Sequence, residues 1–171
     1  MTSLFKHASY AEDQPNSHAI LYLHVIRAAA MAGSFGSLLT APLSLLVSRY
    51  RYATPFTVSS SLSRLLIHSG RGLVIGAILG VVATTGRMVG KEEIEWQDRA
   101  WRLQENKGEE DTDIVAFNAA VTGSIIGGFS ARRGQLSGLS IRGGVLGGAG
   151  LGMASGVGYM ISTFTKGRQP V

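Results

Sequence analysis

The stretch GGVLGGAGLGMASGVGYMISTF, residues 143–164, decides the fold of this 171-residue chain. It carries no charged side chain and is long enough to cross the hydrocarbon core of a bilayer as a helix. Four of its glycines recur at every fourth position: Gly144, Gly148, Gly152 and Gly156. Because four residues are slightly more than one helical turn, these glycines would form a bare stripe along a helix.

In water such a helix would be poor, since each interior glycine costs about 1 kcal/mol relative to alanine. In a bilayer, small residues instead let two helix backbones approach closely, so the stripe predicts a helix-packing face. The same spacing recurs in other apolar segments, at Gly72, Gly76 and Gly80, at Gly123 and Gly127, and more weakly at Ala29, Gly33 and Ser37.

These segments predict an all-α membrane protein with four transmembrane helices packed through glycine and small-residue seams. A polar N-terminal segment, residues 1–18, precedes one membrane domain, residues 19–171. The expected spans cover about 19–47, 62–89, 114–131 and 139–164, and the third is close to the minimum of about 17 residues for a span.

The polar connector between the second and third spans, residues 91–113, predicts a short amphipathic helix at the membrane interface. Trp96 and Trp101 are interleaved with charges there, and tryptophan is enriched at headgroup level. Two interpretations are open: an interfacial docking surface for a partner through the two tryptophans, or a solvated connector that they anchor.

Charge predicts the orientation of the bundle. All eleven acids lie in residues 12–13 and 92–113, whereas the two loops that join spans one to two and three to four hold arginines and no acid. The positive-inside rule places such loops in a bacterial cytoplasm or a mitochondrial matrix. An even number of spans then puts both termini and the connector on the opposite side.

Composition and motifs argue against catalysis. The chain has no cysteine, its four histidines lack metal-ligand spacing, and no phosphate-binding loop is present. We therefore expect no catalytic residue, no cofactor site and no metal site. The candidates for ionisable groups that would mark a polar path through the membrane are His24, Arg27 and His68, and they are expected near helix ends, where they can reach the interface. The net charge of +5 is scattered, without the aromatic-interleaved patch of a nucleic-acid surface, so no nucleic-acid partner is expected.

The segment DIVAFNAAVTGSIIGGFSARRG, residues 113–134, resembles the third-span signature of the mitochondrial Tim family. That family comprises four-span subunits of inner-membrane preprotein translocases and a related accessory subunit of respiratory complex I. The matching positions are Lys107, Asp111, Asn118, Gly123, Gly127, Arg133 and Gly134. The spacing to Gly123 from either Asp111 or Asp113 departs from the family pattern and indicates an insertion ahead of span three.

The resemblance implies a multi-pass protein of the mitochondrial inner membrane with both termini in the intermembrane space. Its partners would be the lipid bilayer and other membrane subunits of a respiratory or translocase complex. The inserted residues and the tryptophan-bearing connector favour the complex I accessory branch, a non-catalytic role in assembly and stability. A subunit of a preprotein translocase is the alternative.

The orientation is testable because the chain has no native cysteine. In mitochondria with a ruptured outer membrane, we expect a cysteine at Asn106 to react with an impermeant thiol reagent and one at Ser59 to be protected. Reaction at Ser59 with protection at Asn106 would invert the topology.

Overall fold

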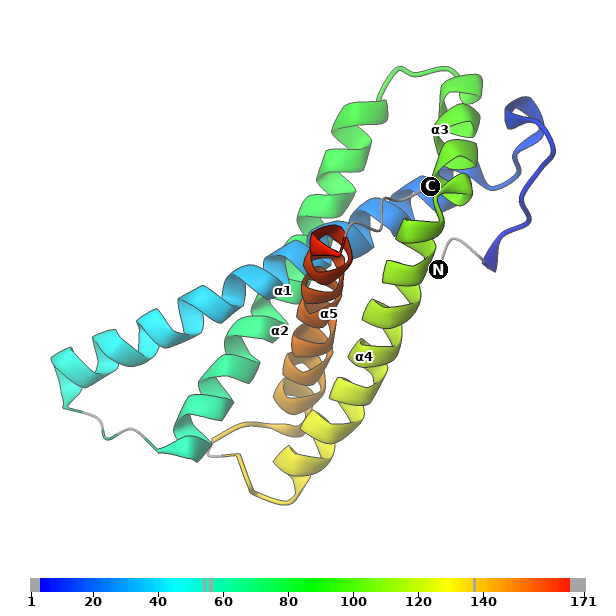
Figure 1. Cartoon of the computed structure of the whole chain (residues 1–171). Coiled ribbons are helices and arrows are strands. Elements are labelled where there is room, and N and C mark those ends of the chain that lie inside the picture. Colours follow the sequence, from blue (N-terminus) through cyan, green and yellow to red (C-terminus); the bar gives the residue numbers. More distant parts are fainter. Residues whose placement is uncertain (1–3, 54, 56, 137, 167–171) are drawn as a thin grey trace.

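The computed structural model describes residues 4–53, 55, 57–136 and 138–166. Within these ranges the chain is helical and contains no strand (Figure 1). The elements are a short 3-10 helix, η2 (Ala11–Asp13), and five α-helices: α1 (Ser17–Tyr52), α2 (Val58–Met88), α3 (Glu93–Glu105), α4 (Lys107–Arg132) and α5 (Ile141–Thr165).

Four of the helices, α1, α2, α4 and α5, are long and apolar enough to cross a membrane. The predicted all-helical class with four membrane spans is confirmed at this level, and it is consistent with a multi-pass membrane protein. The helices extend beyond most of the predicted bounds, and α1 continues to Tyr52 rather than ending near residue 47.

Polar caps determine where three of these helices begin. The Ser60 backbone N–H donates to Thr57 Oγ1 (3.1 Å) before α2, and the Gly143 N–H donates to Ser140 Oγ (3.1 Å) before α5. Before α4, Asn106 Oδ1 accepts from the Gly108 N–H at 3.1 Å. Each cap satisfies an N–H group that has no partner within its helix.

The cap at Asn106 places the start of α4 ahead of the predicted third span. Because α4 begins at Lys107, it includes residues 107–113, which the sequence reading had assigned to the connector. The connector helix α3 is correspondingly short and ends at Glu105. The last seven residues of the predicted connector therefore form the first two turns of α4.

The long helices pack in a fixed order. α1 lies along α2 and α4 lies along α5, and α5 also contacts both α2 and α1 (Figure 1). By contrast, α1 and α4 share almost no packing along their lengths. α5 is therefore the central helix of the bundle, in contact with the other three.

At one end, the N-terminal segment and α3 form a cap over α1 and α2. A small apolar cluster lies there, made of Ile20, Leu21, Met88, Trp96 and Ala100. Gln14 is buried in the N-terminal segment, where its amide donates to the carbonyl oxygens of Lys6 (2.9 Å) and Pro15 (3.0 Å). The segment is attached to α3, where Gln104 Nε2 donates to the Phe5 carbonyl oxygen at 3.2 Å.

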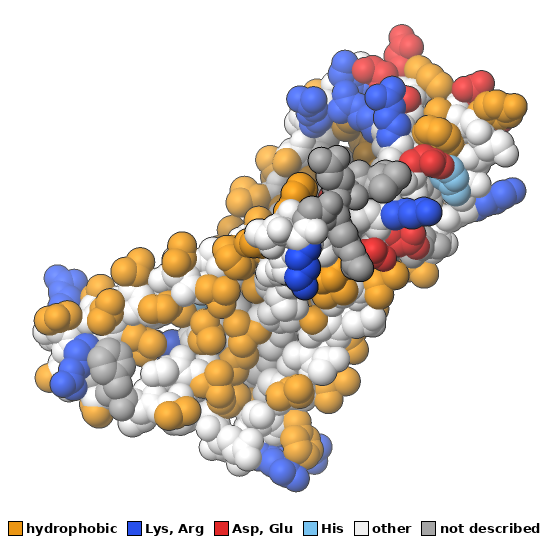
Figure 2. All heavy atoms as spheres, in the orientation of Figure 1, with side chains coloured by type: hydrophobic (Ala, Val, Ile, Leu, Met, Phe, Trp, Pro, Cys, Tyr) orange, Lys and Arg blue, Asp and Glu red, His pale blue; other side chains and the backbone are white. Residues whose placement is uncertain are grey.

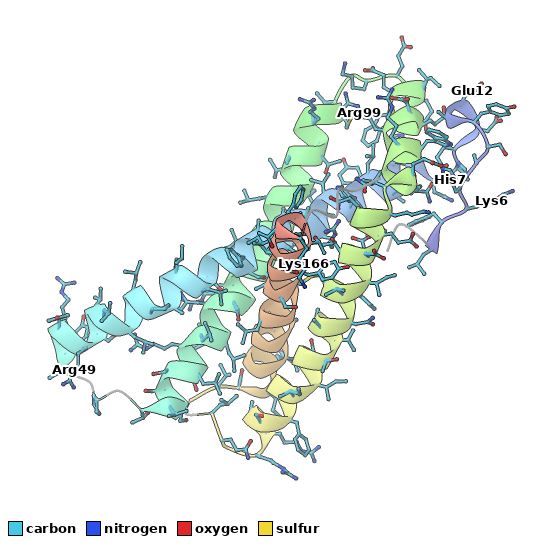
Figure 3. The ribbon with its side chains drawn as sticks, in the orientation of Figure 1. Lys6, His7, Glu12, Arg49, Arg99 and Lys166 are labelled. Carbon is cyan, nitrogen blue, oxygen red and sulfur yellow. The ribbon has the colours of Figure 1, made fainter. Side chains whose placement is uncertain are left out.

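Charges separate along the long axis of the molecule. Figure 2 shows an apolar middle, carboxylates gathered with basic residues at the α3 end, and basic residues without carboxylates at the opposite ends. Figure 3 places Lys6, His7, Glu12 and Arg99 at the α3 end and Arg49 at the far end of α1. We refer to these as the mixed-charge end and the basic end.

Candidate functional site

A group of four ionisable side chains joins α1 to α4 near the mixed-charge end. Arg27 Nε lies 2.5 Å from Asp113 Oδ1, and Arg27 Nη2 donates to Glu109 Oε2 at 2.7 Å. His24 Nδ1 lies 3.2 Å from the same Nη2. Arg27 and Asp113 are each only 2% exposed. We call His24, Arg27, Glu109 and Asp113 the charged junction.

The spacing of the two acids explains the geometry of the charged junction. Glu109 and Asp113 lie one turn apart on α4, so both carboxylates reach the same side of that helix. The guanidinium carries several donors in a planar fork and can bind both carboxylates at once. A buried ion pair requires such partners, because an unpaired charge is strongly disfavoured out of water.

The charged junction corrects the expectation for Arg27. Its side chain does not extend to the interface but is buried and ion-paired. Glu109 and Asp113 were not predicted as site residues, because both belong to the predicted polar connector, residues 91–113. The sequence did contain a signal for this ion pair: Arg27 lies near the start of one apolar segment, and Glu109 and Asp113, four residues apart, precede another. Among the described residues, no group of three His, Asp or Glu side chains has a geometry that could hold a metal ion.

Glycines of α2 lie close to the backbone of α1. A Cβ built on Gly72 or Gly76 would lie less than 3.0 Å from backbone atoms of Gly33 or Ala29 of α1, respectively. One built on Gly80 would lie 2.6 Å from the Ile26 Cα. Real Cβ atoms do not come this close, so these positions of α2 admit no larger residue without movement of a backbone.

The α5 glycines are divided between two neighbouring helices. Added Cβ atoms at Gly144, Gly148 and Gly152 would collide with the α4 backbone, at Gly127, Gly123 and Ala119 respectively. At Gly156 the nearest atoms belong to side chains, Ala116 Cβ and Met31 Cε, both at 2.8 Å.

A second set of α5 glycines, absent from the predicted stripe, faces α2. Added Cβ atoms at Gly147 and Gly150 would collide with the backbone at Leu66 and Ser69. The Ser69 hydroxyl also donates to the Gly147 carbonyl oxygen at 2.8 Å, a buried hydrogen bond between α2 and α5. α5 therefore presents glycine to two helices on different sides.

The positions that match the Tim-family pattern are spread along α4. Lys107 is its first residue, and Asp111 is exposed one turn later. At the other end, Arg133 follows the helix with its guanidinium 4.2 Å from the centre of the Phe129 ring. Gly134 has φ +69°, a conformation that glycine adopts without strain.

The two tryptophans of the connector contact the chain's own N-terminal region. Trp96 is 7% exposed and stacks on His18 with ring centroids 3.9 Å apart, so it packs inside the protein instead of forming a docking surface. His18 also hydrogen bonds to Glu93, and this contact, followed by one from Ser17, lowers the pKa of Glu93. Trp101 Nε1 donates to the Ala8 carbonyl at 2.9 Å; this ring is only partly buried, and its docking role remains a prediction.

Asn118 lies near the middle of α4 and is exposed. Its side chain borders a groove of about 560 Å³ between α4, α5 and α2, which also includes Thr122 and Ser155. Neither a hydrogen bond nor an ion pair joins the Asn118 amide to another residue of the described ranges. We call this hollow the α4 groove.

Residues 4–154 match a protein family described as a protein of unknown function, DUF1757. The chain belongs to the DUF1757 family. The match covers the N-terminal cap, the charged junction and most of the bundle, and it ends within α5. A comparison with curated proteins found no match.

The charged junction yields a stability prediction. Asp113→Asn should leave the buried Arg27 without its closest counter-charge and lower the free energy of unfolding by about 3–5 kcal/mol, measured in detergent micelles. Asp111→Asn, an exposed change two residues earlier on α4, is the control and should have little effect. The double variant Arg27→Met/Asp113→Leu should recover part of the loss, because it removes the two buried charges and leaves only the partly exposed Glu109 carboxylate without its partner. Equal stability of the two asparagine variants would contradict this account.

The glycine contacts give a second prediction, which concerns substitutions that add a single methyl group to a helix. Gly148→Ala should force α4 and α5 apart and cost about 1–3 kcal/mol in unfolding free energy. Gly158→Ala, on the same helix, places its Cβ in open space and should be neutral or slightly stabilising. Unfolding in micelles, followed by circular dichroism, measures both, and an unchanged Gly148→Ala protein would show that the contact can relax freely.

Proposed function

We propose that this protein is a non-catalytic accessory subunit of a complex in the mitochondrial inner membrane. In this proposal its four spans form a small body through their glycine seams, and its outer faces bind larger membrane subunits. Respiratory complex I is the preferred assembly, and the protein would support the assembly and stability of that complex.

The exposed Asn118 amide is the observation that carries this proposal. A primary amide facing hydrocarbon loses its hydrogen bonds to water, and a residue of a neighbouring helix can replace them. The groove beside it offers further hydroxyl groups at Thr122, Ser130 and Ser155 among apolar residues. This mixture suits a protein helix better than acyl chains, which offer no hydrogen-bonding group.

The glycine contacts support the first half of the proposal. Van der Waals packing at close backbone distance drives helix association in lipid, where the hydrophobic effect between helices is absent. At most a third of the apolar window of each long helix is buried within the chain. Much of the apolar surface is thus left for lipid or for other subunits.

The mitochondrial assignment and the Tim-family relationship rest on the third-span resemblance and on the charge pattern. The acid-free basic end suits the matrix side under the positive-inside rule, and the mixed-charge end then faces the intermembrane space. At that end α3, with its partly exposed Trp101, would lie at the membrane interface beside the partner. The inserted residues before the third span favour the complex I branch over the translocases.

Deletion of the protein and co-migration of the wild-type chain on native gels test the proposal. In cells that lack the protein, we expect complex I to be less abundant on blue-native gels while preprotein import into isolated mitochondria stays normal. Co-migration of the wild-type chain with complex I should accompany this. An import defect that precedes any respiratory loss would favour the translocase alternative.

A point substitution tests the role of the α4 groove. Asn118→Leu should insert normally but reduce co-purification with the partner complex, because it removes the amide without adding charge. Asn118→Gln, which keeps an amide, is the matched control and should retain more of the association. Equal recovery of the complex with both variants would exclude the Asn118 amide as a contact.

A further inference from the structure

Arg71 lies in the middle of a membrane-spanning helix. It is thirteen residues after Val58 and seventeen before Met88 in α2, which places its Cα about 20 Å along the helix axis from the first of these. The hydrocarbon core is about 30 Å thick, so this position falls inside it when the helix is centred in the bilayer.

Unlike Arg27, Arg71 has no counter-charge among the residues that the structure describes. It is exposed, and it makes no hydrogen bond or ion pair within the part of the chain that the structure describes. Residues 14–91 and 114–171 contain no aspartate or glutamate, so no acid of α1, α2 or α5 can approach it. Charged side chains within a membrane are normally paired or exposed to water, and an anion from outside the chain would meet this requirement.

Two apolar grooves meet at Arg71. One, of about 690 Å³, lies between α1 and α2 and is bordered by Gly33, Gly36 and Leu79 among others. The other, of about 330 Å³, lies between α2 and α5 and is bordered by Leu66 and Leu146. Ile75 belongs to both grooves. The cation thus lies between two hollows wide enough to take flexible hydrocarbon chains.

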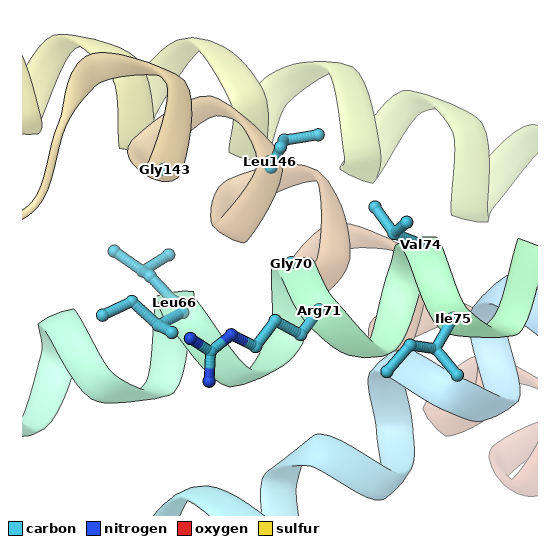
Figure 4. Close-up of a pocket in the computed structure, with 8 residues that line it drawn as sticks. Leu66, Gly70, Arg71, Val74, Ile75, Gly143 and Leu146 are labelled. Carbon is cyan, nitrogen blue, oxygen red and sulfur yellow. The ribbon is translucent and has the colours of Figure 1, made fainter.

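The Arg71 side chain is directed toward the basic end. Figure 4 shows it running along α2 back toward Leu66, with the guanidinium on the side of the helix N-terminus. That direction is usual for a helical side chain and brings the charge closer to the headgroups of the basic side. In the α1–α2 groove, His68 lies between Arg71 and the basic end and contacts Thr40 Oγ1 at 3.0 Å.

We propose that Arg71 binds the phosphate of an anionic phospholipid whose acyl chains lie in the α1–α2 and α2–α5 grooves. The headgroup would lie toward the basic end, where the arginines of the two acid-free loops add to the attraction. A guanidinium matches a phosphate through two parallel hydrogen bonds, and the groove walls match the chains by their apolar character.

A carboxylate on a partner's transmembrane helix is the competing occupant. The direction of the side chain argues against it, because Arg71 points toward the level of lipid headgroups rather than across the middle of the bilayer. The polar groups of the two grooves also differ. His68 and Arg71 border the α1–α2 groove, whereas Asn118 borders the α4 groove. The lipid proposal does not depend on which complex holds the protein.

Native mass spectrometry of the full chain tests the proposal. The purified protein is titrated with dioleoyl phosphatidylglycerol and, as a matched neutral lipid, dioleoyl phosphatidylcholine. We expect one phosphatidylglycerol to bind on the order of tenfold more tightly than phosphatidylcholine. Arg71→Gln should abolish this preference. Arg87→Gln, which also removes one positive charge but near the C-terminal end of α2, should keep it.

A pair of glycine variants tests the site of the acyl chains. Gly36→Leu should fill the α1–α2 groove without meeting other atoms at its Cβ, and it should weaken binding of both lipids. Gly86→Leu, also at an open position but outside this groove, should leave binding unchanged.

Three outcomes would overturn the proposal. The first is a wild-type protein without preference for the anionic lipid. The second is an equal loss in Arg71→Gln and Arg87→Gln, which would show a general effect of net charge. The third is unchanged lipid binding by Arg71→Gln together with loss of a co-purified membrane subunit, which would assign Arg71 to a partner's carboxylate.

Discussion

Close approach of helix backbones at α5 is the constraint on which the arrangement of the bundle depends. Gly144, Gly148 and Gly152 meet the α4 backbone, while Gly147 and Gly150 meet that of α2. Because the contacts are made by main-chain atoms, a single methyl group at these positions would change the distance between helices. In a bilayer this kind of packing replaces the burial of apolar side chains that stabilises a protein in water.

The ends of the molecule are built differently from its middle. At one end the charged junction links α1 to α4, two helices that otherwise make almost no contact. At the same end α3 and the N-terminal segment cover α1 and α2 and share a small apolar cluster with them. At the other end the loops carry arginines and no acids. All acids of this chain lie in residues 12–13 and 92–113, and two of them pair with Arg27. No acid belongs to α2 or to α1 and α5, the helices that border the grooves at Arg71.

The outer surface offers two distinct polar features among apolar side chains. Asn118 on α4 is a neutral amide suited to a hydrogen bond with a neighbouring helix, whereas Arg71 on α2 is a cation suited to a phosphate. Both lie on long helices with adjoining grooves, and neither has a partner in the described chain. Taken together, the two proposals describe a small subunit that binds protein at Asn118 and anionic lipid at Arg71.

Apolar length and four-residue periodicity are local properties, so the amino-acid sequence alone predicted a helical protein with four membrane-length helices. The sequence also predicted that the acids lie on one side of the bundle and the two acid-free, arginine-bearing loops on the other. The contacts between helices are known from the three-dimensional structure alone. It shows that Gly147 and Gly150 face α2, that Trp96 is enclosed and that α4 begins at Lys107. The pairing of Arg27 with Asp113 joins residues 86 positions apart. Such contacts depend on the three-dimensional register of helices that are distant in sequence, which no local pattern specifies.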